Sequence, residues 1–526
     1  MSRLFISATR KSSGKTTVAL GICAALVHRE LAVQTFKKGP DYIDPMWLSR
    51  SSGRPCINLD FNTMCSDELL ATLAYYQSLS DVSIIEGNKG LYDGVDTFGT
   101  DSNAALCKLT QTPVILVVDA EGSTRGVAPL ILGYQQFDLE ISIAGVIFNK
   151  TGGPRHETKL RGVMEQYTDV DVLGCIPKNT EMMLPERHLG LVTDKEMEID
   201  VAAAYVAHTR QVVEDCVQID SLVSLLSPKE PCPKARFSTE QEPNSRTQNL
   251  PALASIQNRK TVPASGAVRI GVAKDNAFCF YYQDDLDVME ECGAQIHFFD
   301  TLHDNALPDV DALFIGGGFP ETHGKELENN SAMRSAIKAF AASGKPIYAE
   351  CGGLMYLTRE IRWKEEISEM VGVIPADTHM FKRPIGRGYV ELVCDSAHPW
   401  GTSTLGSADQ GSRLQDPAGK CSKQHWTEMV ATGDVIKAHE FHYSKLVNIG
   451  SEVQYAYKVK RGHGIDGDRD GLMIDCVLAN YAHMRHSRSN PWVSRFLYAV
   501  SKHKSQINKI ECAETTSPFT TTHCKD

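Results

Sequence analysis

Residues 344–357 read Gly344-Lys345-Pro346-Ile347-Tyr348-Ala349-Glu350-Cys351-Gly352-Gly353-Leu354-Met355-Tyr356-Leu357, and this stretch decides the fold of the C-terminal half. A short apolar run ends at one cysteine, two glycines follow, and a helix-like apolar pattern then begins. This order predicts a sharp strand-to-helix elbow that presents a nucleophile at the carboxyl end of a sheet. A helix that starts directly after Cys351 would aim its amides at the sulfur and favour the thiolate. We therefore predict that Cys351 is a nucleophile, whereas the other cysteines are structural.

A second stretch, upstream, fits this elbow. Residues 312–321 read Ala-Leu-Phe-Ile-Gly-Gly-Gly-Phe-Pro-Glu, which is a predicted strand that runs into a glycine-rich loop. Backbone amides of such a loop can stabilise the oxyanion that forms when a nucleophile attacks a carbonyl. We assign Gly317, Gly318 and Gly352 to this oxyanion site.

Both stretches resemble class I glutamine amidotransferase domains and, more narrowly, the cobyrinate a,c-diamide synthase family. A thiol nucleophile needs a base within hydrogen-bond reach. The family carries its base in an Ala-Ser-Tyr-x-His string near the C-terminus, and residues 479–483, Ala-Asn-Tyr-Ala-His, match it. The resemblance therefore implies His483 as the base, with His442 as the alternative. Many class I enzymes carry a glutamate two residues after the histidine, but Arg485 stands there, so a Cys–His pair without a visible third acid is expected.

The N-terminal half opens with a predicted phosphate-binding loop. Residues 9–17 read Thr-Arg-Lys-Ser-Ser-Gly-Lys-Thr-Thr between a short apolar strand and a helix from Val18. Amides of such a loop wrap phosphates, its lysine reaches the outer phosphates, and its hydroxyl ligates Mg²⁺. Thr9 stands where the strict pattern has glycine, so a lysine-rich turn is the alternative. We assign four residues to ATP: Gly14, Lys15, Thr16 and Thr17.

Acidic residues follow two further predicted strands of this half. Residues 37–45 read Lys-Lys-Gly-Pro-Asp-Tyr-Ile-Asp-Pro, nearly a signature of the same family, and residues 86–94 read Glu-Gly-Asn-Lys-Gly-Leu-Tyr-Asp-Gly. Ligands bind at the carboxyl ends of strands in open α/β sheets. We assign Thr16, Asp41 and Glu86 to Mg²⁺, and Lys37, Asp44 and Asp93 to the substrate. Alternatively, the two aspartates of the first string only cap a turn. Asn149, after another strand, either reads the nucleotide base or forms a turn.

Length and composition define the broad class. The chain has 526 residues, a net charge of −11, and 15 cysteines without a Cys-x-x-Cys pair. This favours two to four domains in a reduced, cytoplasmic compartment, without nucleic acid or membrane as partner. Apolar strand-like runs that alternate with helix-like segments indicate the α/β class. Four parts are expected: an ATP-binding amidoligase domain (1–223), a linker (224–265), a class I amidotransferase domain (266–500) with a polar insertion (395–432), and a disordered tail (501–526). The first domain is predicted to be a doubly wound parallel P-loop sheet similar to dethiobiotin synthetase.

The resemblance implies a carbon–nitrogen ligase that uses ATP, Mg²⁺ and L-glutamine to amidate acetate side chains of a tetrapyrrole polycarboxylate. Cobyrinate is the first expected substrate, in cobalamin biosynthesis. Sirohaem or a related isobacteriochlorin is the alternative, because residues 36–40 and 61–64 look like a branch linked to sulfite reductases. A non-enzymatic P-loop switch and a ligase that uses free CO₂ are two further hypotheses. A homodimer is one expected assembly, and ammonia is expected to pass between the domains.

Overall fold

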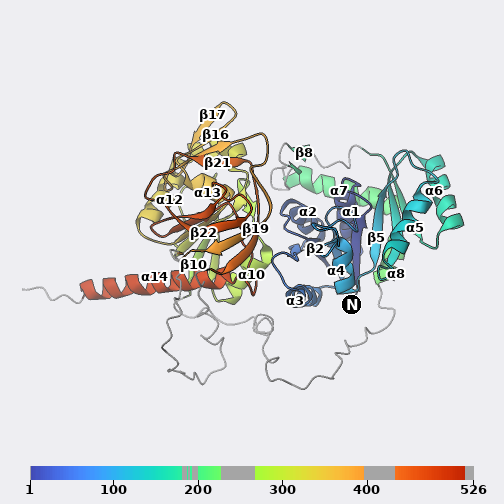
Figure 1. The fold of residues 1–526 in the computed structure, drawn as a ribbon, viewed down its shortest axis with the longest axis horizontal. Coiled ribbons are helices and arrows are strands. Elements are labelled where there is room, and N and C mark those ends of the chain that lie inside the picture. The colour runs from blue at the N-terminus through green and yellow to red at the C-terminus, as the bar shows by residue number, and fades with distance from the viewer. Residues whose placement is uncertain are drawn as a thin grey trace, which may run out of the picture. The chain divides into compact units, whose positions relative to one another are not determined.

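The computed structural model describes residues 2–179, 186–187, 190–191, 199–226, 267–395, 398 and 433–515. The chain divides into two compact units, Met1–Ala254 (unit 1) and Ser255–Asp526 (unit 2). Figure 1 shows that each unit has its own sheet with helices on both faces. Each unit is therefore described by itself.

Unit 1 is built on a seven-stranded sheet in the order β3-β2-β4-β1-β5-β6-β7, and every neighbouring pair is parallel. The strands are β1 (Ser2–Ala8), β2 (Val33–Lys38), β3 (Ile57–Leu59), β4 (Val82–Glu86), β5 (Val114–Asp119), β6 (Ile143–Thr151) and β7 (Val172–Pro177). The carboxyl ends of β1, β2 and β4 are neighbours at one edge, where the predicted nucleotide and acidic residues follow them. The separate two-residue strands β8 (Glu186–Arg187) and β9 (Gly190–Leu191) pair with each other.

Helices cover both faces of this sheet because successive strand residues point to opposite sides. The helices are α1 (Lys15–His28), α2 (Ile43–Ser52), α3 (Ser66–Gln77), α4 (Asn103–Thr110), α5 (Val127–Phe137), α6 (Pro154–Tyr167), α7 (Ile199–Cys216) and α8 (Ile219–Leu226). In β1, Leu4 and Ile6 pack toward α1, α7 and α8, whereas Phe5 packs toward α3, α4, α5 and α6. This arrangement confirms the predicted doubly wound parallel fold.

Unit 2 contains a nine-stranded sheet in the order β12-β10-β13-β15-β24-β23-β22-β19-β20. Its first five strands are parallel: β12 (Gln295–Phe299), β10 (Arg269–Ala273), β13 (Ala312–Ile315), β15 (Ile347–Glu350) and β24 (Val477–Asn480). The other four continue it antiparallel: β23 (Arg469–Ile474), β22 (Gln454–Arg461), β19 (Gly386–Cys394) and β20 (Val435–His442). A smaller sheet has the order β17 (Glu366–Glu369), β16 (Glu360–Trp363), β18 (Asp377–Met380), β21 (Ser444–Val447). Two short strands, β11 (Phe278–Phe280) and β14 (Gly317–Gly318), pair with each other.

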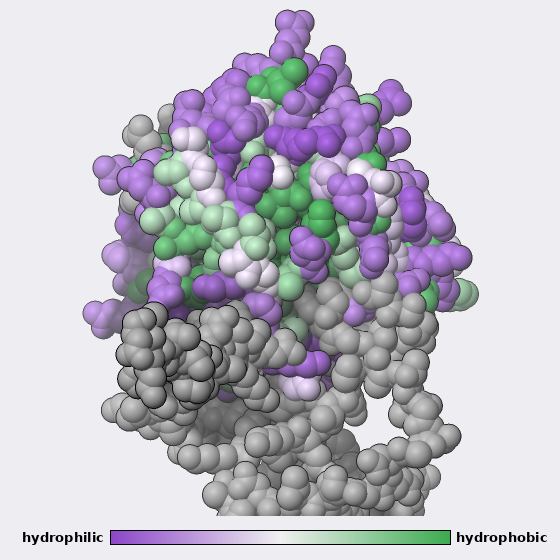
Figure 2. Space-filling view, turned by 90° about the vertical axis from the view of Figure 1, so that its left-hand side faces the viewer, coloured by the Kyte–Doolittle hydropathy of each residue, from purple (hydrophilic) through white to green (hydrophobic). Residues whose placement is uncertain are grey.

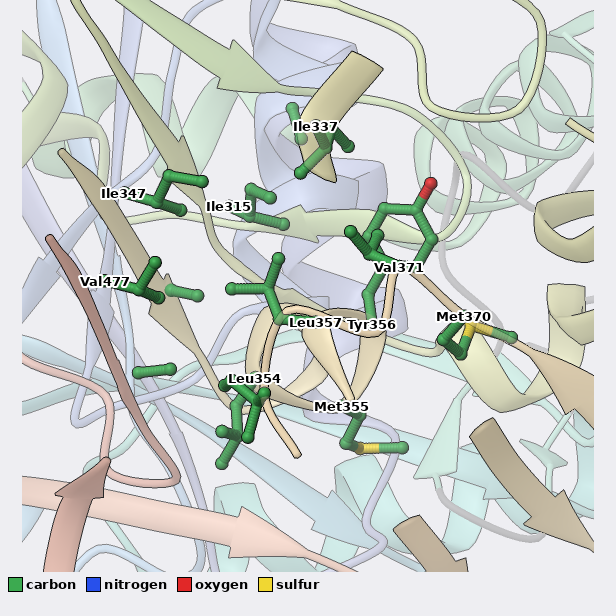
Figure 3. Close-up of a cluster of buried hydrophobic side chains, with 14 of the residues drawn as sticks. Ile315, Ile337, Ile347, Leu354, Met355, Tyr356, Leu357, Met370, Val371 and Val477 are labelled. Carbon is green, nitrogen blue, oxygen red and sulfur yellow. The ribbon is translucent and has the colours of Figure 1, made fainter. Parts of the chain in front are cut away.

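Two hydrophobic clusters lie on the two faces of the large sheet. One includes side chains of α12 (Ser331–Ala342) and α13 (Gly352–Leu357), and the other includes α10 (Gln283–Glu291) and α14 (Trp492–Thr515). Figure 3 shows Leu354 and Leu357 of α13 beside Ile315, Ile347 and Val477 of the sheet. The helix after the predicted nucleophile is thus anchored in the core. The shorter helices η3 (Pro320–His323) and α11 (Gly324–Asn329) follow the glycine-rich loop.

The surface of unit 2 differs from these clusters. Figure 2 shows mainly hydrophilic side chains around a smaller hydrophobic area on the face turned toward the viewer. Among the described residues, none of the helices is long and apolar enough to pass through a membrane.

One predicted boundary is wrong. We expected a disordered tail from residue 501, but α14 continues to Thr515. The buried residues Leu497 and Val500 precede this part of the helix. Lys504 ties this part of the helix to the sheet, since its ammonium bonds the Ala267 carbonyl at 3.0 Å and Asp311 at 2.8 Å. The predicted linker starts inside α8, and nearly all of the linker, most of the insertion and residues 516–526 lie outside the described residues.

Candidate active site

The predicted elbow forms at Cys351, between the end of β15 and the start of α13. Cys351 has φ 47° and ψ −101°, a backbone conformation that L-residues seldom adopt and that is enriched at functional sites. Close packing requires glycine behind it, because a Cβ on Gly353 would lie 2.1 Å from the Ile315 carbonyl oxygen. The Gly353 amide donates to the Gly316 carbonyl at 3.0 Å. The thiol is thus held on a tight turn against the glycine-rich loop.

His483 reaches the same edge of the sheet from the neighbouring strand. β15 and β24 are parallel with Glu350 opposite Asn480, and the Cys351 amide donates to the Asn480 carbonyl at 2.7 Å. His483 follows this strand by three residues and is 2% exposed. Its ring lies against the glycine-rich loop, because a Cβ on Gly317 would lie 2.4 Å from its Cε1 atom.

The three glycines assigned to the oxyanion lie close together. Gly317 and Gly318 form β14, and a Cβ on Gly352 would lie 3.0 Å from the Gly318 nitrogen. A side chain at position 352 would therefore fill the space beside the loop amides. This geometry leaves backbone donors, rather than side chains, next to the elbow.

The protonation state of the thiol differs from our expectation. Burial raises the pKa of Cys351 well above its ordinary value, and the nearby Glu321 raises it further. The Gly352 amide lowers this pKa, as expected, but the effect of burial is larger. The start of α13 therefore does not suffice to form the thiolate, and the thiol needs a base to take its proton.

Two side chains lie beside His483, and sequence reasoning missed the first of them. The Oε2 atom of Glu350 lies 3.6 Å from His483 Nδ1, so an acid does face the histidine although position 485 is arginine. His439 of β20 stacks on the His483 ring, with centroids 4.9 Å apart and planes 17° from parallel. Burial and His483 lower the pKa of His439 well below its ordinary value, which keeps its imidazole neutral. A charged residue inside the buried run 347–350 was the available signal for Glu350.

His442, the alternative base, also lies near the elbow. The carbonyl oxygen of its neighbour Phe441 is 4.0 Å from the Cys351 sulfur. The His442 ring stacks on Tyr481 at 3.8 Å, and its Nδ1 lies 2.9 Å from the Ser444 carbonyl. These contacts hold the His442 ring in place, so a structural role is sufficient to explain its burial.

We expect His483→Ala to lower the glutaminase rate by a factor on the order of 10² or more, as loss of a general base does. His442→Ala should cost less, because its ring is engaged by Ser444 and Tyr481. Glutamate release by the two purified variants measures the difference. A larger loss for His442→Ala would move the base to that residue.

The phosphate-binding loop of unit 1 lies between β1 and α1. Gly14 has φ +82°, and a Cβ there would lie 2.1 Å from the Asn149 amide nitrogen, so the loop requires glycine at this point. Asn149 donates to the Ser13 carbonyl at 2.9 Å. Its side-chain amide therefore buttresses the loop. Thr17 is turned toward α7, where its hydroxyl bonds Tyr205.

An ionic cluster fills the carboxyl edge of the sheet beside this loop. The Thr16 hydroxyl donates to Glu86 Oε1 at 2.7 Å and approaches Asp44 Oδ2 at 3.3 Å. The Lys37 ammonium lies 3.1 Å from Glu86 Oε1 and also bonds Asp44. Burial alone would lower the pKa of Lys37 and raise that of Asp44, but their attraction reverses both shifts, so both stay charged.

The remaining predicted acids lie elsewhere. Asp41 Oδ1 accepts the amides of Ile43 at 3.0 Å and Asp44 at 3.1 Å, so this carboxylate caps the start of α2. Burial and the adjacent Asp44 raise the pKa of Asp41 to about 7. Asp93 is exposed and accepts the Gly90 amide at 2.9 Å. The geometry thus places Asp44, rather than Asp41, next to Thr16 and Glu86.

These residues fit a nucleotide-bound Mg²⁺. The Oε2 atom of Glu86 is buried and has no hydrogen-bond partner among the described residues, so one oxygen is left for a cation. The described residues contain no cluster of three or more His, Cys, Asp or Glu that could hold a metal alone. Mg²⁺ does not need one, because it usually combines one or two carboxylates with phosphate oxygens and water.

Comparison with known proteins gives the same division of the chain. Residues 4–192 match the CobQ/CobB/MinD/ParA nucleotide binding domain, and residues 269–491 match the CobB/CobQ-like glutamine amidotransferase domain. The cobyrinate a,c-diamide synthase of Magnetococcus marinus is 40% identical over 491 residues, which cover 93% of this chain and 95% of that protein. The synthase of the same name from Methanosarcina acetivorans is 36% identical over 507 residues, which cover 92% of each chain. The chain therefore belongs to the cobyrinate a,c-diamide synthase family.

Proposed function

We propose that this protein amidates the a and c acetate side chains of cobyrinate, with glutamine as nitrogen donor and ATP·Mg²⁺ as activator, in cobalamin biosynthesis. The observation that carries the proposal is the 40% identity to a cobyrinate a,c-diamide synthase over nearly the whole chain. The juxtaposition of Cys351, His483 and the glycine loop supports the glutaminase half. The Thr16–Asp44–Glu86 cluster beside the phosphate-binding loop supports the ATP half.

In the glutaminase half, Cys351 is the nucleophile and His483 the base. The thiol proton passes to His483 as sulfur bonds the amide carbon of glutamine, and the amides of Gly317, Gly318 and Gly352 stabilise the oxyanion. His483 then protonates the leaving nitrogen, ammonia departs, and a thioester remains. Water attacks the thioester with His483 as base, releases glutamate and restores the thiol.

In the ligase half, a substrate carboxylate must be activated, because it has no good leaving group. Attack of its oxygen on the γ-phosphorus of ATP gives an acyl phosphate and ADP, and ammonia then displaces phosphate to form the amide. Loop amides beside Gly14 and the ammonium of Lys15 hold the phosphates, and Lys37 and Asp93 are assigned to the substrate. Thr16, Glu86 and Asp44 would hold Mg²⁺, which neutralises charge on the transferring phosphoryl group when bound. Asp44 is proposed as a ligand in place of Asp41 because its Oδ2 atom lies 3.3 Å from the Thr16 hydroxyl oxygen.

Sirohaem amidation is the second candidate. It is favoured by two sequence variants, Phe36-Lys37-Lys38-Gly39-Pro40 and Phe61-Asn62-Thr63-Met64. Both substrates carry acetate side chains on a tetrapyrrole, so the same two half-reactions serve either one.

The acyl phosphate gives a direct test of the proposed chemistry. Hydroxylamine should trap it as a hydroxamate when the Cys351→Ala variant, which has no ammonia supply, is given ATP, Mg²⁺ and cobyrinate. Trapping should require both ATP and the tetrapyrrole. ADP formation without any hydroxamate would contradict carboxylate activation.

The setting proposed for this reaction is the reduced cytoplasm, where the substrates ATP, glutamine and a tetrapyrrole polycarboxylate are small molecules. A homodimer is the proposed assembly, and measurement of the molecular mass in solution tests it. Neither nucleic acid nor a membrane is a partner in this proposal.

A further inference from the structure

Glu350 is an acid at the end of an otherwise apolar buried strand. It is 3% exposed, and its Oε1 atom accepts the Tyr348 hydroxyl at 2.6 Å and the Met484 amide at 2.9 Å. Its other oxygen, Oε2, faces His483 Nδ1 at 3.6 Å. We propose that Glu350 is the positioning residue that completes a Cys351–His483–Glu350 triad, in which the acid is supplied by the residue just before the nucleophile.

The surroundings of His483 fix which of its nitrogens serves the thiol. Gly317 contacts the Cε1 edge of the ring, and His439 covers one face of it. Nδ1 lies on the side of the Glu350 carboxylate. A proton on Nδ1 is therefore favoured, and Nε2 keeps the lone pair that accepts the thiol proton.

Many class I enzymes carry the third acid two residues after the histidine. Here that position is Arg485, which makes other contacts. Arg485 is fully buried, bonds Asp284, and lies 4.9 Å from the centroid of the Tyr282 ring. A carboxylate at position 485 would lose these contacts. Register between β15 and β24 instead brings Glu350 to the histidine from the adjacent strand. A triad is defined by such geometry and not by sequence order.

Several charged or titratable groups lie around Cys351 and His483. They are Glu350 of β15, His439 of β20, Asp470 of β23, Glu321 of η3, Tyr282 before α10, and Arg485 after β24. Asp470 accepts the Tyr481 and Ala482 amides at 3.0 Å each and so shapes the backbone before His483. Glu350 approaches the His483 ring itself, with 3.6 Å between its Oε2 atom and Nδ1 of the ring.

Glu350→Gln tests the charge while the side-chain volume is kept. The glutaminase kcat should fall about 10–100-fold, as loss of a carboxylate that orients a histidine does in metal sites, with little change in the KM for glutamine. Amidation driven by added ammonium salt should stay at the wild-type rate, which also shows that the variant is folded.

Two further variants separate this role from a structural one. Tyr348→Phe removes a hydrogen bond to Glu350 but keeps the charge, so its glutaminase rate should change only a few-fold. Glu350→Asp keeps the charge but moves the carboxylate away from Nδ1 of His483, so kcat should fall with little change in the KM for glutamine. Should Glu350→Gln not fold, the aspartate variant decides, and an unchanged kcat there would overturn the proposal.

The triad is also overturned if Glu350→Gln hydrolyses glutamine at the wild-type rate or loses rate only through a higher KM for glutamine. The inference rests on the proposed glutaminase half, and the two fail differently. A wild-type protein that does not hydrolyse glutamine contradicts the proposed function. If the wild-type protein hydrolyses glutamine and Glu350→Gln does so at the same rate, the triad alone is contradicted.

Discussion

Cys351→Ala is expected to abolish glutamine-driven amidation and to leave amidation with added ammonium salts near the wild-type rate. The thiol forms the covalent bond that releases ammonia, and nothing in the ligase half uses it. Its loss should therefore remove the glutaminase rate completely, within detection, because the neighbouring glycine amides cannot replace a nucleophile. Both activities are measured by product mass, with glutamine and with ammonium chloride as donor.

Cys394→Ala is the matched control for this variant. Cys394 ends β19, is 2% exposed, and also has a pKa raised by burial, but it packs in the cluster of α10 and α14. The same truncation should therefore lower stability without removing either activity. Loss of ammonia-driven amidation in a folded Cys351→Ala protein would contradict the division into two half-reactions.

The second large effect is expected for Glu86→Gln in unit 1. Glu86 is fully buried, bonds Thr16, and has one oxygen left for a cation. Removal of its charge should lower amidation with either donor on the order of 10³-fold, since stabilisation of a transferring phosphoryl group is worth several kcal/mol. Glutamine hydrolysis should persist. Raising the Mg²⁺ concentration should ease the defect, and EDTA should reproduce it in the wild-type protein.

A matched pair of aspartates tests the geometry of the same site. Asp44→Asn removes a carboxylate beside Thr16 and Lys37, and it should behave like Glu86→Gln. Asp41→Asn removes a carboxylate that caps α2, so it should lower the melting temperature more than the Mg²⁺ dependence. The reverse ranking would return the metal role to Asp41.

Local patterns were sufficient for the two loops at the candidate sites. The elbow at Cys351 and the loop at Gly14 could be predicted because glycine is needed at fixed offsets from a strand and a helix. The roles of the carboxylates were harder to predict. Asp41 and Asp44 are three residues apart, and only the start of α2 at Ile43 decides which one faces Thr16.

The contact of Glu350 with His483 depends on register between strands far apart in the sequence. Their pairing follows from packing of β15 beside β24, and a single sequence does not show it. The thiol pKa was missed for a similar reason, since burial at Cys351 is a property of the whole fold. The helical end of α14 was missed because a polar helix and a polar coil have similar composition.

The central claim is best tested by one product analysis. Cobyrinate, hydrogenobyrinate and sirohaem are each offered to the purified protein with ATP, Mg²⁺ and glutamine, and the products are weighed by mass spectrometry. We expect cobyrinate to gain two amides, at the a and c acetates, with no amide formed when ATP is withheld. Amidation of sirohaem with cobyrinate left unchanged would contradict the assignment and establish the alternative substrate.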